Sequence, residues 1–163
     1  EKHDDPINKK SGVQKRCVLM CQCQHRNMKL KMLQETEQNV LRMQMVRHLE
    51  KKRVVIFAGG TGNPFFSTDT AASLRASELN CSVIIKATKV DGIFDKDPIN
   101  NKNARIYKKI SYSEVINKNL KVMDTTSISL AKESNIPILI TNIFKKNSII
   151  NALNGKGLYS IIH

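Results

Sequence analysis

The stretch that most constrains the fold of this chain runs from Arg53 to Thr70 and has the sequence RVVIFAGGTGNPFFSTDT. Its apolar run, Val54–Phe57, has the length and the β-branched content of a strand. A glycine-rich turn follows, and then a Ser-Thr-Asp-Thr cluster typical of a helix start. Glycines let a backbone approach a ligand closely, and the N–H groups of a helix N-terminus attract anions. The stretch therefore predicts a strand, a loop and a helix that form a phosphate-binding cradle.

The glycine-rich loop by itself is not specific for nucleotides. It matches neither GxxxxGK[ST] nor GxGxxG, the two commonest nucleotide-binding patterns. A tight turn with a good helix N-cap is the plain structural alternative. Phe65 and Phe66 can pack a base or a ribose, but we expect at least one of them to be an ordinary core residue.

The rest of the chain alternates between strand and helix patterns. The run Ser82–Lys86 is a second strand, so strand, helix and strand follow one another within about 30 residues, the size of a βαβ unit with parallel strands. Further elements are expected as a short strand or edge piece at Ile106–Ile110, a helix capped by Ser111 and Glu114, a helix at 127–134, a strand at 138–141, a helix at 148–153 and a strand at 158–162. This order predicts an α/β fold with three layers, α/β/α, and a mainly parallel sheet.

Three linked motifs carry a family resemblance. They are GTGNPFFSTDTAASLRASE from Gly60, KATKVDGIFDKDP from Lys86, and LKVMD from Leu120. In this order and spacing they resemble the bacterial-type UMP kinases (uridylate kinases) of the amino acid kinase family, over roughly residues 46–163. The resemblance implies the C-terminal, ATP-binding part of the amino acid kinase fold. It also implies transfer of the γ-phosphoryl group of ATP, with Mg²⁺ held mainly by the phosphates, to UMP.

The resemblance also implies roles for individual residues. Those implied to contact UMP are Thr61, Gly62, Asn63, Pro64, Phe65, Phe66, Ser67 and Thr68. Those implied to contact ATP are Thr88, Phe94 and Asp97. Asp124 is implied to lie near the phosphates and to organise the transfer. No residue is assigned as a metal ligand.

The chemistry of these residues leaves some alternatives open. Asp124 precedes a Thr-Thr-Ser helix start, so an N-cap role alone would explain it, and both roles are compatible. Asp69 is a candidate cap of the helix that follows the cradle. Lys86 and Lys89 are candidate phosphate partners on their charge alone, and Lys89 suits a solvated surface equally well.

The N-terminal part is expected to differ from the rest. Residues 1–27 are polar and aperiodic, which predicts a disordered or weakly held arm, and residues 28–52 have the spacing of a helix. We therefore expect one α/β nucleotide-binding domain over residues 28–163. A cluster of Cys17, Cys21, Cys23 and His25 lies in the arm, but its spacing is not a usual zinc pattern, so free thiols are expected.

The family's N-terminal lysine- and glycine-rich phosphate loop has no clear match in residues 1–52. Lys10-Ser11-Gly12 has a similar composition but follows no apolar strand. This gap raises an alternative function, a truncated, non-catalytic nucleotide-binding fragment of the same family. A relative that phosphorylates a carboxylate or a carbamate is a third possibility, against which the GTGNPFF loop argues.

Bulk properties exclude some classes of protein. The net charge is +13, with 13 basic and 6 acidic residues up to position 53 and 14 and 8 after it. Because the excess is spread along the chain, we do not expect nucleic-acid binding as the main function, although the charge would steer anionic nucleotides. No apolar run approaches the roughly 20 residues of a membrane helix. We expect a cytoplasmic protein, and the resemblance implies a homo-oligomer, a hexamer in that family.

Overall fold

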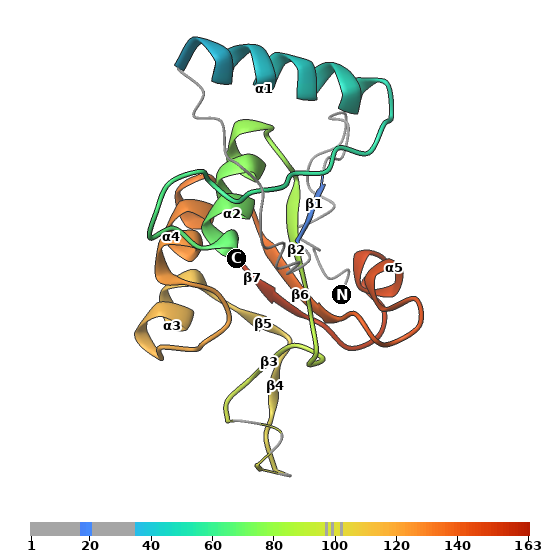
Figure 1. Ribbon diagram of the computed structural model, residues 1–163. Coiled ribbons are helices and arrows are strands. Elements are labelled where there is room, and N and C mark those ends of the chain that lie inside the picture. Colours follow the sequence, from blue (N-terminus) through green and yellow to red (C-terminus); the bar gives the residue numbers. More distant parts are fainter. Residues whose placement is uncertain (1–16, 21–34, 97, 99, 102) are drawn as a thin grey trace.

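A five-stranded sheet forms the centre of the structure, a computed structural model that describes residues 17–20, 35–96, 98, 100, 101 and 103–163 (Figure 1). In spatial order its strands are β1 (Cys17–Met20), β2 (Val83–Thr88), β6 (Ile138–Asn142), β7 (Ser160–Ile162) and β5 (Lys109–Ile110). Neighbouring strands are parallel except for β6 and β7, which are antiparallel. The predicted mainly parallel sheet is confirmed.

Helices cover both faces of this sheet. On one side lie α2 (Thr68–Glu78), α3 (Tyr112–Asn117) and α4 (Thr125–Glu133), and on the other lies α5 (Ser148–Leu153) (Figure 1). A buried apolar cluster fills the space between the sheet and the helices on each of its two faces. The arrangement is therefore the three-layer α/β/α fold that the sequence predicted.

The central strands are apolar on both faces, as strands buried between two helical layers must be. Successive side chains of β2 alternate, with Ile84 in the cluster beneath α2 and α4, and Val83 and Ile85 in the cluster beneath α5. In β6, Ile138 lies in the first cluster and Leu139 in the second. These isoleucines and leucine are at most 1% exposed, and their burial provides much of the hydrophobic stabilisation.

Small residues let α2 and α4 approach each other closely. Ala72 and Ala76 of α2 are buried in the cluster that also contains Ala131 of α4. Ser73 and Ser127, both fully buried, share a hydrogen bond of 2.7 Å between their hydroxyl oxygens. That bond satisfies two polar groups that the close packing removes from water.

Capping residues set the starts of the helices. Ser67, and not the candidate Asp69, caps α2, because its side chain accepts the backbone N–H groups of Asp69 and Thr70. Ser111 with Glu114 forms the predicted capping box of α3. Helix α4 begins at Thr125, earlier than the expected residue 127, because Asp124 is its N-cap. The N-cap interpretation of Asp124 is therefore confirmed.

A small hairpin projects from the sheet between β2 and α3. It pairs β3 (Ile93–Phe94) with β4 (Ile106–Tyr107) in antiparallel register (Figure 1). The expected strand or edge piece at Ile106–Ile110 thus consists of two short strands, β4 in the hairpin and β5 in the main sheet. No helix in the described part of the chain combines the length and apolar character needed to cross a membrane.

One expectation for the first third of the chain is wrong where the structure describes it. The run Val54–Phe57 is not a strand, and Val54 and Ile56 are 90% and 88% exposed. Instead β1, which lies within the segment expected to be a disordered or weakly held arm, pairs with the edge of β2 in the register Cys17–Val83 to Met20–Lys86. Because β1 lies on one side of β2 and β6 on the other, β2 has no free edge with which Val54–Phe57 could pair. The other residues of the expected arm lie outside the described residues.

The helix expected at residues 28–52 is described from its middle onward, as α1 (Glu35–Glu50). Of its apolar residues, Met45, Val46 and Leu49 pack against the core. Arg42 attaches the helix to the end of α2 by donating a hydrogen bond to the carbonyl oxygen of Glu78 at 2.9 Å. The segment from residue 51 to Ser67 then leads to the opposite end of α2 (Figure 1).

Replacing Gly92 should destabilise the fold for lack of space. A Cβ at this position would lie 2.3 Å from the hydroxyl oxygen of Ser160, on β7. We expect Gly92→Ala to lower the free energy of unfolding by about 1–3 kcal/mol in urea titrations. In the double variant with Ser160→Ala the loss should be smaller than the sum of the two single losses. Additive losses would show that the predicted clash with the Ser160 hydroxyl does not occur.

Candidate functional site

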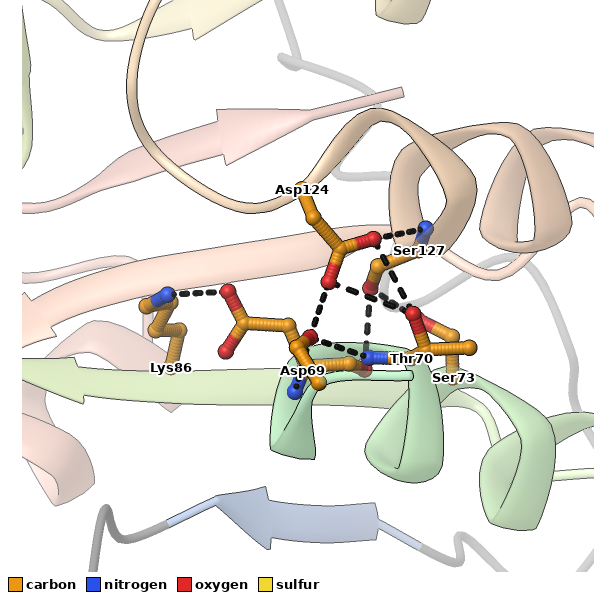
Figure 2. Close-up of polar contacts among 7 residues, drawn as sticks. Asp69, Thr70, Ser73, Lys86, Asp124 and Ser127 are labelled. Carbon is orange, nitrogen blue, oxygen red and sulfur yellow. Dashed lines mark hydrogen bonds and ion pairs between the residues drawn. The ribbon is translucent and has the colours of Figure 1, made fainter. Parts of the chain in front are cut away.

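The N-termini of α2 and α4 meet beside the carboxyl-terminal half of β2, and Figure 2 shows the polar side chains gathered there. The carboxylate of Asp124 lies at the centre of this group. It accepts a hydrogen bond from the backbone N–H of Ser127 at 2.7 Å, which caps α4. It also accepts from the hydroxyls of Ser67 and Thr70, in the first turn of α2. One carboxylate therefore joins the starts of two helices.

These contacts favour the charged form of Asp124. Burial by itself raises the pKa of this carboxyl, but the hydrogen bonds from Ser67, the Ser127 amide and Thr70 outweigh burial and hold its pKa below the ordinary value. The positive ends of two helix dipoles further suit a negative charge at this point. Asp124 is therefore an anion at neutral pH, fixed in direction by its donors.

A buried ion pair lies next to this carboxylate. Lys86 of β2 and Asp69 of α2 are 2.8 Å apart between Nζ and Oδ2, and each side chain is 11% exposed. The second oxygen of Asp69, Oδ1, is buried and has no hydrogen-bond partner. A buried charge with a free acceptor is costly unless a further donor or a cation reaches it. Asp69 is thus the residue here with unused binding capacity.

The backbone behind the ion pair is held in place by a serine. The Ser127 hydroxyl donates to the carbonyl oxygen of Asp69 at 2.9 Å (Figure 2). Through its backbone N–H, the same residue binds Asp124. Asp69 and Asp124 are therefore held by one residue of α4, which makes the group rigid.

A cavity of about 410 Å³ opens beside the two carboxylates. Asp69 and Asp124 line it together with Lys121 and with apolar residues of α3, α4 and their connection, among them Ile116 and Met123. Its wall carries both charge signs, which suits a ligand with anionic and apolar parts.

The glycine-rich loop precedes this group in the chain and ends at Ser67. Gly59, Gly60 and Gly62 all have positive φ, between 68° and 90°. Asn63 donates its backbone N–H to the Thr61 hydroxyl oxygen at 3.1 Å, which tightens the turn. A turn built from glycines with positive φ lets its backbone come close to an anionic or polar ligand.

The two phenylalanines of the loop differ from expectation. Neither is a core residue, since Phe65 is fully exposed and Phe66 is 50% exposed. Both rings are exposed because the chain must reach the N-cap of α2 at Ser67 directly after them. Phe65 also has a φ of 69°, a strained conformation for a bulky residue. Strain and exposed aromatic surface are more typical of ligand-binding loops than of packing.

Of the residues predicted to contact ATP, two are described and Asp97 lies outside the described residues. Thr88 ends β2, two residues beyond Lys86, and its hydroxyl donates to the carbonyl oxygen of Val90 at 2.7 Å. Phe94 lies half-buried in β3. Among the contacts described, neither reaches Asp124, whereas Ser67 from the predicted UMP-binding stretch does.

The structure adds residues to which the sequence assigned no settled role. Lys86 was a candidate on its charge alone, and Asp69 was a candidate cap, yet they form the buried ion pair. Thr70 was expected only as part of the Ser-Thr-Asp-Thr helix start and as a hydroxyl donor of the cradle, yet its hydroxyl binds Asp124. A lysine inside an otherwise apolar strand is a signal that could have marked this site, because lysine is almost never fully buried without a partner.

The sequence is similar to known proteins of one family. A model of the amino acid kinase family matches residues 10–142, so the match begins earlier in the chain than residue 46. A uridylate kinase of Wolbachia pipientis wMel is 52% identical over 122 residues, which are 75% of this chain and 49% of that relative.

Solved structures give the same result for the fold. A UMP kinase from Ureaplasma parvum matches 92% of this chain with a TM-score of 0.71 and 34% identity. A UMP kinase from Bacillus anthracis matches 94% with a TM-score of 0.73 and 30% identity. This chain covers 60% of each of those two structures and about half of the Wolbachia relative.

The charge of Asp124 should contribute to stability in a pH-dependent way. Its pKa is lowered from 3.8 in the folded state, so its contribution is fully present above that value and is lost as the pH falls through the folded pKa. We expect Asp124→Asn, which can still cap α4, to unfold about 1–3 kcal/mol more easily near pH 7. Urea titrations should show this difference shrinking as the pH falls below 3.8. A difference independent of pH would contradict the charged role.

Proposed function

The chain belongs to the amino acid kinase family, and on that premise we propose that it is the nucleotide-binding part of a UMP kinase, which transfers the γ-phosphoryl group of MgATP to UMP and gives UDP and ADP. The observation that carries the proposal is the junction of two helix N-termini at Asp124 beside the buried Lys86–Asp69 pair. Phosphoryl transfer depends mainly on holding phosphates in place and balancing their charge. Helix N-termini, a lysine and rigid carboxylates provide these functions.

The glycine-rich loop is the proposed UMP side. Thr61 to Thr68 would surround the nucleotide, with open backbone N–H groups and hydroxyls facing its polar atoms. Asn63 both donates and accepts through its side-chain amide, as the edge of uracil requires. The exposed ring of Phe65 or Phe66 would pack on the base or the ribose, which would bury apolar surface now in water.

The end of β2 and the hairpin are the proposed ATP side. Thr88, Phe94 and Asp97 would contact the adenosine part of ATP, as the family resemblance implies. Lys86 precedes Thr88 on the same strand, so a nucleotide bound at Thr88 would extend its phosphates toward the ion pair.

In the transfer, an oxygen of the UMP phosphate forms a bond to the γ-phosphorus as the bond to the β–γ bridging oxygen breaks, and ADP leaves. Lys86 would balance the phosphate charge while Asp69 holds its ammonium group in position. Asp124 would orient the Ser67 and Thr70 hydroxyls. Bound with the nucleotide, Mg²⁺ would neutralise the phosphates, and the free Oδ1 of Asp69 suits a contact with it.

A second candidate is a nucleotide-binding fragment without catalytic activity. The chain spans about half the length of the Wolbachia relative, and the family's N-terminal phosphate loop has no clear match in its sequence. Loss of preorganised cations from such a site would reduce the rate by orders of magnitude.

By the family resemblance we also propose a cytoplasmic homo-oligomer.

The deciding experiment measures ADP release from MgATP with and without UMP, together with the binding of each nucleotide by calorimetry. UMP-dependent release supports the kinase. Binding of both nucleotides without release supports the fragment. A chain that binds no UMP would overturn both assignments.

Lys86→Met should lower UMP-dependent turnover by about 10²–10³-fold, because the phosphate charge loses its cation. The variant leaves Asp69 buried and unpaired, so its free energy of unfolding should also be lower by about 3–5 kcal/mol. Adding Asp69→Asn should restore much of the stability but none of the turnover. Lys156→Met, which removes an exposed lysine, is the matched control and should keep wild-type rates. Turnover that recovers with stability would contradict the role of Lys86.

Asn63→Ala should weaken UMP binding at least about tenfold, because the uracil edge loses its hydrogen-bonding partner. Calorimetry should find MgATP binding unchanged. The control is Asn151→Ala, at an exposed position of α5 on the opposite face of the sheet, which should leave both affinities as they are. If UMP binds equally well to all three proteins, the loop is not the acceptor site.

A further inference from the structure

We propose that Asn142 and Lys145, in the connection between β6 and α5, are positioning residues that hold the nucleotide-binding turn in its binding conformation. We define this turn as residues Thr88–Phe94, between the two described residues that were predicted to contact ATP. The inference rests on the proposed function. It adds a role for a segment to which the sequence analysis assigned none.

Asn142 ties the turn to β6 with its side-chain amide. Its Nδ2 donates to the carbonyl oxygen of Lys89 and to the carboxylate of Asp91, each at 3.1 Å. Its Oδ1 accepts the backbone N–H of Phe144 at 2.9 Å. Both ends of the amide are therefore used, and the side chain has one orientation relative to two loops.

Lys145 binds the other oxygen of the Asp91 carboxylate. Its Nζ lies 2.7 Å from Oδ2 of Asp91, while Asn142 binds Oδ1. The hydrogen bond from Lys145 lowers the pKa of Asp91, against a smaller opposing effect of burial, with Asn142 adding to the lowering. The Asp91 side chain is 22% exposed and that of Lys145 is 55% exposed, so the ion pair lies at the rim of the turn.

Other bonds anchor the two ends of the turn to the sheet. Next to Thr88, the backbone N–H of Ile143 donates to the Thr88 carbonyl oxygen at 2.9 Å. At the far end, the backbone N–H of Ile93 donates to the Ser160 hydroxyl at 2.8 Å. Between these anchors, the contacts of Asn142 and Lys145 reach Lys89 and Asp91. They therefore act on the part of the turn that the sheet holds least directly.

This geometry separates two roles for Lys145. If the lysine positions the turn through Asp91, removing either partner has the same effect, and removing both adds nothing further. If it instead binds a phosphate directly, removing Asp91 frees the lysine and leaves MgATP binding intact or tighter. The side chain of the neighbouring Lys146 is exposed and makes no hydrogen bond or ion pair with the described residues. Replacing it therefore removes the same charge without removing a contact to the turn.

The test compares Lys145→Gln, Asp91→Asn, their double variant and Lys146→Gln in the full chain, with dissociation constants for MgATP and for UMP. We expect Lys145→Gln and Asp91→Asn each to weaken MgATP binding about three- to fivefold. The double variant should be no weaker than either single variant, and Lys145→Arg should bind as the wild type does. Lys146→Gln should change MgATP binding less than about twofold, and UMP binding should be unchanged throughout.

Hydrogen exchange of the free protein separates this inference from the proposed function. Amides of Val90–Ile93 should exchange faster in Lys145→Gln than in the wild type and in Lys146→Gln. Unchanged exchange, or equal MgATP affinities of the Lys145 and Lys146 variants, would overturn the positioning role. A wild-type chain that binds no MgATP, but whose turn loosens in Lys145→Gln, would overturn the ATP assignment and, with it, the nucleotide role of these residues.

Discussion

The candidate site depends on one carboxylate that binds the N-termini of two helices. Asp124 caps α4 through Ser127 and binds the hydroxyls of Ser67 and Thr70 at the start of α2. A neutral capping residue would satisfy α4 alone, whereas a charged carboxylate has enough acceptor capacity for both helices. Because the two N-termini are brought together there, the site combines positive helix ends with fixed negative charge.

The sheet supplies the remaining part of the site. Strand β2 is buried on both faces up to Lys86, whose ammonium group is paired with Asp69. The same strand ends at Thr88, and its parallel neighbour β6 ends at Asn142. Because parallel strands present their carboxyl ends at one edge, the ion pair and the nucleotide-binding turn lie along one strand end. The position of both follows from the pairing of two strands.

The first third of the chain shows where local sequence is insufficient. Val54–Phe57 has the composition of a strand, yet it forms none and its Val54 and Ile56 side chains are exposed, while Cys17–Met20 pairs with β2. Both segments are short and apolar, and an edge offers its hydrogen-bonding groups to whichever segment is held against it. Strand propensity indicates that a segment can join a sheet. It does not identify the strand with which the segment pairs, because that depends on contacts between residues distant in the sequence.

The sequence by itself determined the α/β class, the helix caps at Ser111 and Asp124, and the glycine-rich loop, because these depend on periodicity and on interactions within a few residues. Only the tertiary structure decided that Asp124 also binds α2, that Lys86 meets Asp69, and that Asn142 and Lys145 hold Asp91. Each of these contacts joins residues separated by 17 to 54 positions. Their partners are selected by the packing of strands and helices, which no local pattern encodes.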